Sequence, residues 1–290
     1  MTYILYNPLA GTGDCRARAE EMAKRLKIDH PEMRDVTCTD VSALVKNLAP
    51  SDEIYLVGGD GTLNHFANAV ENDVPRQKIW YYPAGTGNDF MADLGKAGDT
   101  PVCINAYLQN LPRVQVQGKT RLFLNGVGYG IDGYCCETGD ALKARGETKV
   151  NYTAIAIKGL LFGYHPVRAT VTVDGKTQRF KHVWLSPAMN GRYYGGGMEI
   201  APAQDRLNPD RRVSVVVMHC ASKLKTLSVF PSIFKGEHVK HDEMVTVLTG
   251  HDIQVEFDRP TALQIDGETI SGVRGYHVRS AAEASEKAVG

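Results

Sequence analysis

The feature of this chain that most constrains its fold is a change of hydrophobic rhythm near residue 115. Before that point, short apolar runs that fit β-strands alternate with helical patterns, which favours a parallel sheet covered by helices. After it, many short strand candidates follow one another with turns between them, which indicates an antiparallel sandwich or barrel. The sequence therefore predicts two domains, over residues 1–115 and 116–280, and a small polar tail over 281–290.

The expected elements follow from apolar spacing and from turn residues. In the first half, strands are expected over 3–6, 36–37, 53–57 and 78–82, and helices over about 14–27, 41–48, 63–70 and 89–94. In the second half, hairpins are expected over 114–127 and 168–186, the latter with Asp174-Gly175 as its turn. Further strands are expected over 213–218, 244–248, 253–257 and 262–265, and helices within 138–162 and 222–234.

Composition excludes several classes of protein. The 290 residues include 33 Lys+Arg and 33 Asp+Glu, so the chain lacks the basic excess that is typical of nucleic-acid binding. An apolar content of 43% argues against disorder. Residues 1–115 carry a net charge of −4 and residues 116–290 carry +4, which supports a domain boundary.

We expect neither a membrane span nor a secretion signal. No apolar run approaches the roughly 18 residues that a membrane span needs, and no basic region precedes the short apolar run at the N-terminus. The six cysteines lack zinc-site spacing. We therefore expect a cytoplasmic protein with reduced thiols.

The first candidate site is Gly58-Gly59-Asp60-Gly61-Thr62, between an apolar strand and a helical pattern. Glycines there let backbone N–H groups approach phosphate oxygens, and the helix N-terminus adds a favourable partial charge. The Asp60 carboxylate would repel phosphates unless a cation lies between them, and Mg²⁺ is the usual cation. The loop therefore favours a nucleoside triphosphate bound with a metal, and the alternative is a tight turn.

Two further loops fit the same edge of a doubly wound sheet, where ligands bind. Residues 83–90 again join a strand to a helix, and Asn88 could orient a hydroxyl or a phosphate. Asp89 is either a helix N-cap or a second carboxylate near the metal. Residues 7–13 lack the full GxGxxG pattern, so they are equally a turn or a nucleotide contact.

The late stretch over residues 264–269 contains Asp266-Gly267-Glu268. Taken alone, Asp-Gly favours a simple hairpin turn. Glu268 could instead serve as a general base for a substrate hydroxyl.

Together these loops resemble the diacylglycerol kinase catalytic-domain family, which includes bacterial lipid kinases and sphingosine and ceramide kinases. The matching pieces, in the family's order, are Asn7-Pro8 with Gly11, residues 58–64, residues 83–90, Asn125 with residues 128–132, and Asp266-Gly267-Glu268. The first glycine loop is shared with NAD kinases and phosphofructokinases. Residues 85–90 combined with the late Asp-Gly-Glu are more specific to lipid kinases.

The resemblance implies an N-terminal Rossmann-like nucleotide domain, a C-terminal antiparallel β-sandwich domain, and an active site in the cleft between them. It implies ATP and Mg²⁺ as cofactors, with Asp60 and Asp89 in the magnesium network and Glu268 as the proton acceptor. The implied ATP-binding residues are Asn7, Thr37, Gly58, Gly59, Asp60, Gly61, Thr62, Leu63, Asn64, Gly85, Thr86 and Asn88.

One stretch departs from the family pattern. Gly195-Gly196-Gly197-Met198 matches the start of a structural metal loop, but residues 203–214 are about two residues longer than in the family. Arg211 stands where a glycine is usual, so Asp210, or Asp205, is the remaining candidate ligand for that metal.

The expected reaction is transfer of the ATP γ-phosphoryl group to a lipid hydroxyl, with diacylglycerol as the first candidate. The alternatives are an NAD kinase-like soluble phosphotransferase, a catalytically silent lipid-binding protein, and a dinucleotide oxidoreductase, which the missing GxGxxG disfavours. Basic and apolar residues mix in 138–168 and 223–241, which suits peripheral binding at the inner face of the membrane or a packed helix with a basic rim. An edge strand could also pair in a homodimer.

Overall fold

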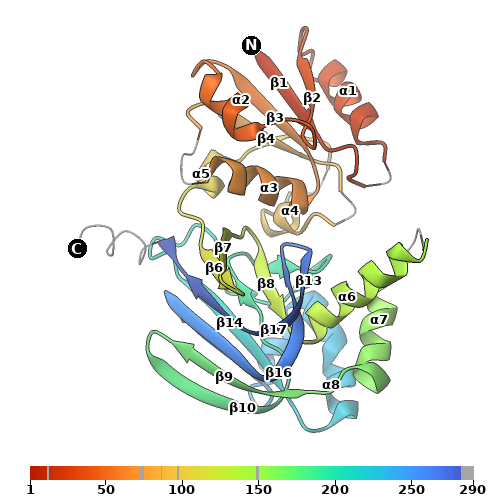
Figure 1. Cartoon of the computed structure of the whole chain (residues 1–290), viewed down its shortest axis with the longest axis vertical. Helices are drawn as coiled ribbons and strands as arrows, with labels where there is room; N and C mark the ends of the chain where they lie inside the picture. The colour runs from red at the N-terminus through yellow and green to blue at the C-terminus, as the bar shows by residue number, and fades with distance from the viewer. Residues whose placement is uncertain (12, 72–74, 86, 97, 148–149, 282–290) are drawn as a thin grey trace. The chain divides into compact units, whose positions relative to one another are not determined.

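The computed structural model describes residues 1–11, 13–71, 75–85, 87–96, 98–147 and 150–281 of the chain (Figure 1). The chain forms two compact units, Met1–Leu111 and Pro112–Gly290. Along the chain, the boundary falls after Leu111, four residues before the one expected at 115, because the strand β6 (Arg113–Val116) pairs with β17 (Glu268–Arg279).

The first unit contains a five-stranded sheet in the order β2-β1-β3-β4-β5. Its strands are β1 (Thr2–Tyr6), β2 (Glu32–Asp35), β3 (Glu53–Gly58), β4 (Lys78–Pro83) and β5 (Val102–Cys103). The first four are parallel, and β5 is antiparallel to β4. Ile4, Ile54 and Leu56 are completely buried, as expected for a parallel sheet covered on both faces.

Four of the described helices of the first unit lie close to their expected positions, and α5 was not expected. The helices are α1 (Cys15–Arg25), α2 (Val41–Asn47), α3 (Asp60–Val70), α4 (Asp89–Asp93) and α5 (Asn105–Leu108). The side chains of Cys15, Ala19 and Met22 on α1 pack into one cluster with Ile4 and Val57 of the sheet. The predicted strand–helix alternation is therefore confirmed.

Two boundaries differ from expectation for local reasons. The second strand ends at Asp35 rather than covering 36–37, because the Asp35 carboxylate accepts the Thr37 N–H at 2.8 Å and hydroxyl at 2.7 Å, which forms a turn. Helix α3 begins at Asp60 rather than at Leu63, because the Gly59 carbonyl already accepts the Leu63 N–H at 3.1 Å. Gly58 is the last residue of β3, so Gly59 alone separates the strand from the helix, and Asp60 lies in the first helical turn.

The second unit is β-rich, with a ten-stranded sheet and a separate two-stranded sheet of β12 and β13. The strands are β6, β7 (Lys119–Leu122), β8 (Gly126–Tyr129), β9 (Val167–Val173), β10 (Lys176–Leu185), β11 (Ala188–Met189), β12 (Tyr193–Tyr194), β13 (Met198–Glu199), β14 (Val213–His219), β15 (Val245–Gly250), β16 (Asp252–Ile265) and β17. The predicted hairpin over 168–186 is present as β9–β10. The hairpin expected over 114–127 is shorter: it is formed by β6 and β7 and ends at Leu122, and β8 is a separate strand.

The long strand β16 closes the larger sheet on itself. Its first half pairs with β9 and its second half with β8, so the path β16-β8-β11-β14-β10-β9 returns to β16. The sequence instead predicted two strands, 253–257 and 262–265; they are one strand with register shifts between Glu256 and Leu263. Inside the unit, the Tyr129 and Phe257 rings stack with centroids 3.9 Å apart.

Helical segments flank this sheet. They are α6 (Ile131–Ala144), α7 (Tyr152–Lys158), a π-helix (Gly159–Gly163), α8 (Lys223–Val229), and the 3₁₀ helices Phe230–Lys235 and Glu237–Lys240. Among the described residues, none of these helices combines the length and apolarity needed to span a bilayer.

His238 makes the stability of the second unit depend on pH. Its ring is completely buried, Nε2 lies 3.0 Å from the Ile200 carbonyl, and Nδ1 has no hydrogen-bond partner among the described residues. Burial lowers the His238 pKa to about 4, so the proton binds more weakly in the folded chain than in the unfolded one.

We expect this unit to be fully stable above about pH 6.5 and to lose roughly 3 kcal/mol of unfolding free energy as the pH falls toward 4. Urea unfolding of the intact chain across this range measures the effect. The variant His238→Gln should flatten the pH dependence, and the exposed-histidine variant His30→Gln should keep it. An equal slope for His238→Gln and the intact chain would contradict the assignment.

Candidate active site

The first group of predicted site residues gathers at the carboxyl edge of the parallel sheet. Strands β1, β3 and β4 are adjacent and parallel, so the segments that leave them emerge at one edge. The Asn7 N–H bonds to the Val57 carbonyl at 3.1 Å, and the Ala84 N–H bonds to the Gly58 carbonyl at 2.8 Å. This is the edge at which open α/β sheets bind their ligands.

The two glycine loops touch backbone to backbone. A Cβ atom on Gly85 would lie 2.5 Å from Gly59 Cα, and one on Gly58 would lie 2.4 Å from Thr62 Oγ1. Gly11 has φ +65°, and a Cβ there would lie 2.5 Å from the Ala84 carbonyl oxygen. Glycine is therefore required where the three segments approach each other.

The Asp60 carboxylate joins the two loops. Its Oδ2 accepts the Asp89 N–H at 2.7 Å, and its Oδ1 accepts the Phe90 N–H at 3.3 Å. Asp89 is itself buried, at 7% exposure. Two carboxylate residues therefore lie at this edge, connected by the hydrogen bond from the Asp89 N–H to Asp60. The pKa of the neighbouring Tyr81 hydroxyl is raised well above its usual range, chiefly by burial and to a smaller extent by the Asp60 charge.

Amide side chains complete the edge. Asn7 Nδ2 donates to Thr62 Oγ1 at 2.8 Å, which attaches the first loop to α3. Asn88 Nδ2 donates to the Gly85 carbonyl at 3.2 Å. Asn88 Oδ1 is buried and has no hydrogen-bond partner among the described residues, so a ligand donor or a cation could occupy its free side.

The remaining predicted nucleotide contacts are placed differently. Leu63 and Asn64 are buried in α3, at 1% and 5% exposure. Thr37 lies in the turn after β2, where its hydroxyl bonds to Asp35. Thr86 lies outside the described residues.

The oxygen donors at this edge fit Mg²⁺. Asp60, Asp89 and Asn88 offer carboxylate and amide oxygens, which are the ligands that Mg²⁺ takes in proteins. Over the described ranges, no three or more His, Cys, Asp or Glu side chains cluster closely enough to hold a metal by themselves. Phosphate oxygens and water would therefore supply the other ligands, as is usual for magnesium in phosphotransferases.

In the second unit, Glu268 follows a two-residue hairpin turn. Asp266 and Gly267 have φ values of 45° and 95°, and Ile265 pairs with Glu268 across the turn. The hairpin reading of Asp-Gly is thus confirmed. The side chain of Glu268 is exposed and forms an ion pair with Arg121 on β7.

Asp266 has a role that sequence reasoning missed. Its carboxylate accepts the N–H groups of Leu124 at 2.6 Å, Asn125 at 2.8 Å and Gly126 at 3.0 Å. Asp266 therefore fixes the entry to β8 beside the turn that carries Glu268. The sequence signal was only the Asp-Gly pair, because the three partners lie more than 100 residues away.

The segment that resembles a structural metal loop has a backbone suited to glycine at several positions. Gly195, Gly196 and Gly197 all have positive φ values, and Arg211 has φ 57°, the conformation that the expected glycine would take. The exposed Asp210 lies 3.7 Å from Arg212 Nε. Asp210 as a metal ligand stays a prediction.

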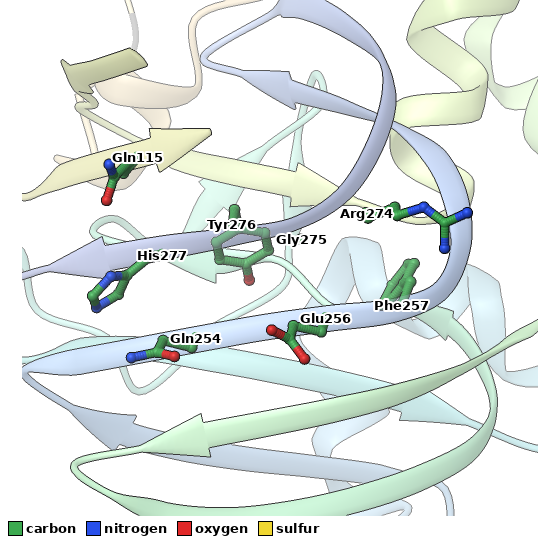
Figure 2. Close-up of a pocket in the computed structure, with 8 residues that line it drawn as sticks. All are labelled: Gln115, Gln254, Glu256, Phe257, Arg274, Gly275, Tyr276 and His277. Carbon is green, nitrogen blue, oxygen red and sulfur yellow. The ribbon is translucent and has the colours of Figure 1, made fainter. Parts of the chain in front are cut away.

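A separate open hollow of about 470 Å³ lies on the sheet of the second unit. Figure 2 shows its lining, with Gln115 from β6, Arg274 and His277 from β17, and Gln254 and Glu256 from β16 among the contributors. None of the predicted site residues lines this hollow.

Comparison with known protein families shows which family the chain belongs to. Residues 1–117 match the diacylglycerol kinase catalytic domain, and residues 125–280 match the YegS C-terminal NAD kinase beta sandwich-like domain. The chain belongs to the diacylglycerol kinase catalytic-domain family. It is a lipid kinase, so the predicted family and enzyme class are confirmed.

Relatives and solved structures agree with this assignment. The diacylglycerol kinase of Mycobacterium tuberculosis H37Rv is 26% identical over 256 residues, covering 83% of this chain and 81% of the relative. The diacylglycerol kinase of Bacillus subtilis is 25% identical over 279 residues, covering 91% and 88%. A crystal structure from Bacillus anthracis, described as a candidate diacylglycerol kinase, has a TM-score of 0.69 at 18% identity and covers 96% and 91%. That likeness confirms the expected fold class, an N-terminal α/β domain and a C-terminal β-rich domain.

The close approach of the loops predicts a sharp difference between two glycines. We expect Gly85→Ala to destabilise the first unit by about 1–3 kcal/mol, because the new Cβ would meet Gly59 backbone rather than a flexible side chain. In Gly61→Ala the Cβ meets nothing within 4 Å, so the free energy of unfolding should stay unchanged or rise. Urea unfolding of both variants tests this, and equal stability of the two would contradict it.

Proposed function

We propose that this lipid kinase transfers the γ-phosphoryl group of ATP to the hydroxyl of diacylglycerol, giving phosphatidic acid, with Mg²⁺ as the required cation. The observation that carries the proposal is the Asp60 carboxylate, which joins the two glycine loops at the ligand-binding edge of the sheet. Both named relatives are diacylglycerol kinases, which supports this acceptor.

In the proposed reaction, the first turn of α3 holds the ATP phosphates. Helix geometry leaves the early N–H groups of a helix without an acceptor in the same helix, and Gly61 presents open space there. The predicted contacts of Asn7, Gly58, Gly59, Thr62, Gly85 and Asn88 surround this turn. Thr37, Leu63, Asn64 and Thr86 remain proposed contacts by family pattern.

Asp60, Asp89 and the Asn88 amide oxygen would hold Mg²⁺ beside the phosphates. When bound, the cation neutralises the charge that develops on the transferred phosphoryl group. Asp60 also keeps α4 in place, so its carboxylate orients the edge as well as binding the metal.

We assign the proton transfer to Glu268. The lipid hydroxyl O–H bond breaks and its proton goes to a Glu268 carboxylate oxygen. The hydroxyl oxygen forms the new bond to γ-phosphorus while the bond to the ADP oxygen breaks. We propose that the lipid is drawn from the inner face of the membrane and that the enzyme is otherwise cytoplasmic. A homodimer formed through an edge strand of the β-rich domain also stays a prediction.

NAD is the rival acceptor, since the C-terminal family model is described as NAD kinase beta sandwich-like. The test supplies the intact chain with γ-labelled ATP and Mg²⁺, and offers NAD or mixed micelles of diacylglycerol, ceramide, sphingosine or phosphatidylglycerol. We expect label in phosphatidic acid, and none after chelation with EDTA. Labelled NADP without labelled lipid would overturn the proposal, and no ADP from any acceptor would support the catalytically silent alternative.

A further inference from the structure

Two large apolar side chains project from the second unit. Phe162 and Leu224 are each 77% exposed, more than any other exposed large hydrophobic side chain described in this unit. They are far apart in sequence but lie on adjoining elements, because Lys223 Nζ donates to the Leu161 carbonyl at 3.2 Å. That bond connects α8 to the π-helix that follows α7.

The structure presents Phe162 on a firm base. Both ends of the π-helix are glycines that pack on Tyr134 of α6: a Cβ on Gly163 would lie 2.3 Å from its hydroxyl, and one on Gly159 would lie 2.9 Å from its ring. Leu160 is buried, at 1% exposure, in the same hydrophobic cluster as Phe230, which follows α8. Phe162 thus points outward from a segment that is anchored on its other side.

The two segments that carry these side chains are basic. The sequence has no Asp or Glu over residues 148–173 or over residues 221–236, the two stretches that carry Phe162 and Leu224. Lys158 and Lys223 are exposed beside them. Acids from other elements lie nearby: Glu243 is paired with Lys225 of α8 at 2.6 Å. Glu137 of α6 lines a hollow together with Gly163 and accepts the Ser271 hydroxyl at 2.5 Å.

We propose that this patch, Phe162 and Leu224 with Lys158 and Lys223, is the surface that docks on an anionic membrane. The apolar side chains would enter the acyl boundary and the lysines would contact lipid phosphates. An exposed apolar pair alone would fit any partner, and the lack of acids within the two segments that carry it favours an anionic lipid surface. The proposal rests on the proposed lipid kinase function, because docking brings the enzyme to a substrate dissolved in the bilayer.

The test is sedimentation of the intact chain with vesicles of phosphatidylcholine alone or with added phosphatidylglycerol. We expect binding to the anionic vesicles that weakens with salt, since screening reduces the lysine contribution. The double variant Phe162→Ala/Leu224→Ala should bind at least about tenfold more weakly, the loss expected from one or two unburied side chains. The control Val247→Ala, an exposed apolar residue on β15, should bind normally.

Activity separates this proposal from the function on which it rests. The double variant should phosphorylate diacylglycerol in vesicles more slowly, in proportion to its weaker binding, and a monomeric short-chain diacylglycerol at the normal rate. Unchanged vesicle binding by the double variant would overturn the docking surface. A dimer in the intact chain that the double variant dissociates would also overturn it. If no lipid is phosphorylated while the double variant still loses binding, only the proposed function fails.

Discussion

Asp60→Ala is expected to lower lipid kinase turnover by at least about 1000-fold, equivalent to roughly 4 kcal/mol of transition-state stabilisation. The carboxylate has two tasks that alanine removes together. It accepts the N–H groups of Asp89 and Phe90, and in the proposed reaction it holds Mg²⁺. Steady-state turnover with labelled ATP and diacylglycerol measures the loss.

Asp60→Asn separates these two tasks. The amide keeps one oxygen that can accept the Asp89 N–H, but it removes the negative charge that binds the cation. We therefore expect a folded variant with turnover close to that of Asp60→Ala, and with a thermal midpoint lowered only by the loss of the longer hydrogen bond from the Phe90 N–H. Wild-type turnover in Asp60→Asn would show that the side chain acts only as a backbone acceptor.

Asp52 provides a matched control at the other end of the same strand. It directly precedes β3, accepts the Ala49 N–H at 2.8 Å and binds the N-terminal ammonium at 2.7 Å. The hydrogen bond from that ammonium is the chief cause of a lowered Asp52 pKa. Asp52→Ala should lower the thermal midpoint without changing turnover per folded molecule. Parallel losses of turnover in Asp52→Ala and Asp60→Ala would mean that the effect is only structural.

The sequence predicted the layers of the fold well because periodicity is a local signal. Alternation of strands and helices in the first unit and Asp174-Gly175 at the β9–β10 turn both follow from neighbouring residues. What it missed depends on particular side chains or on distant pairing. The end of β2 is set by the Asp35 carboxylate, and the closed path of the larger sheet depends on two separate partners of β16.

In the candidate site too, local motifs predicted which residues gather, while the contacts between distant residues were not predicted. The glycine motifs placed Asp60 and Asp89 at one sheet edge, and the structure connects them through a hydrogen bond. Nothing in the motif indicated that Asp60 accepts backbone N–H groups about 30 residues away. Asp266 was read as a turn residue, yet its carboxylate binds three backbone N–H groups. Such contacts follow from the folded geometry, which periodicity does not report.

Glu268→Gln is expected to lower kcat by about 10²–10⁴-fold, the usual contribution of a positioned general base. The loss should be smaller than that of Asp60→Ala, because the metal and the phosphate loop remain. Stability should hardly change, since Glu268 is exposed and a surface ion pair such as that with Arg121 is worth at most about 1 kcal/mol. Turnover and thermal unfolding of the same preparation measure both effects.

Glu137→Gln is the matched control for Glu268→Gln. Glu137 is another exposed carboxylate that contacts β17, where it accepts the Ser271 hydroxyl at 2.5 Å, but it has no proposed role in catalysis. We expect Glu137→Gln to keep normal kcat. Arg121→Gln removes the ion-pair partner and leaves the Glu268 carboxylate available, so it should retain far more activity than Glu268→Gln. The contrary outcome is an equal loss of kcat in Arg121→Gln and Glu268→Gln, with nucleotide affinity unchanged in Glu268→Gln. That outcome would mean that the ion pair itself is required and that another group accepts the proton.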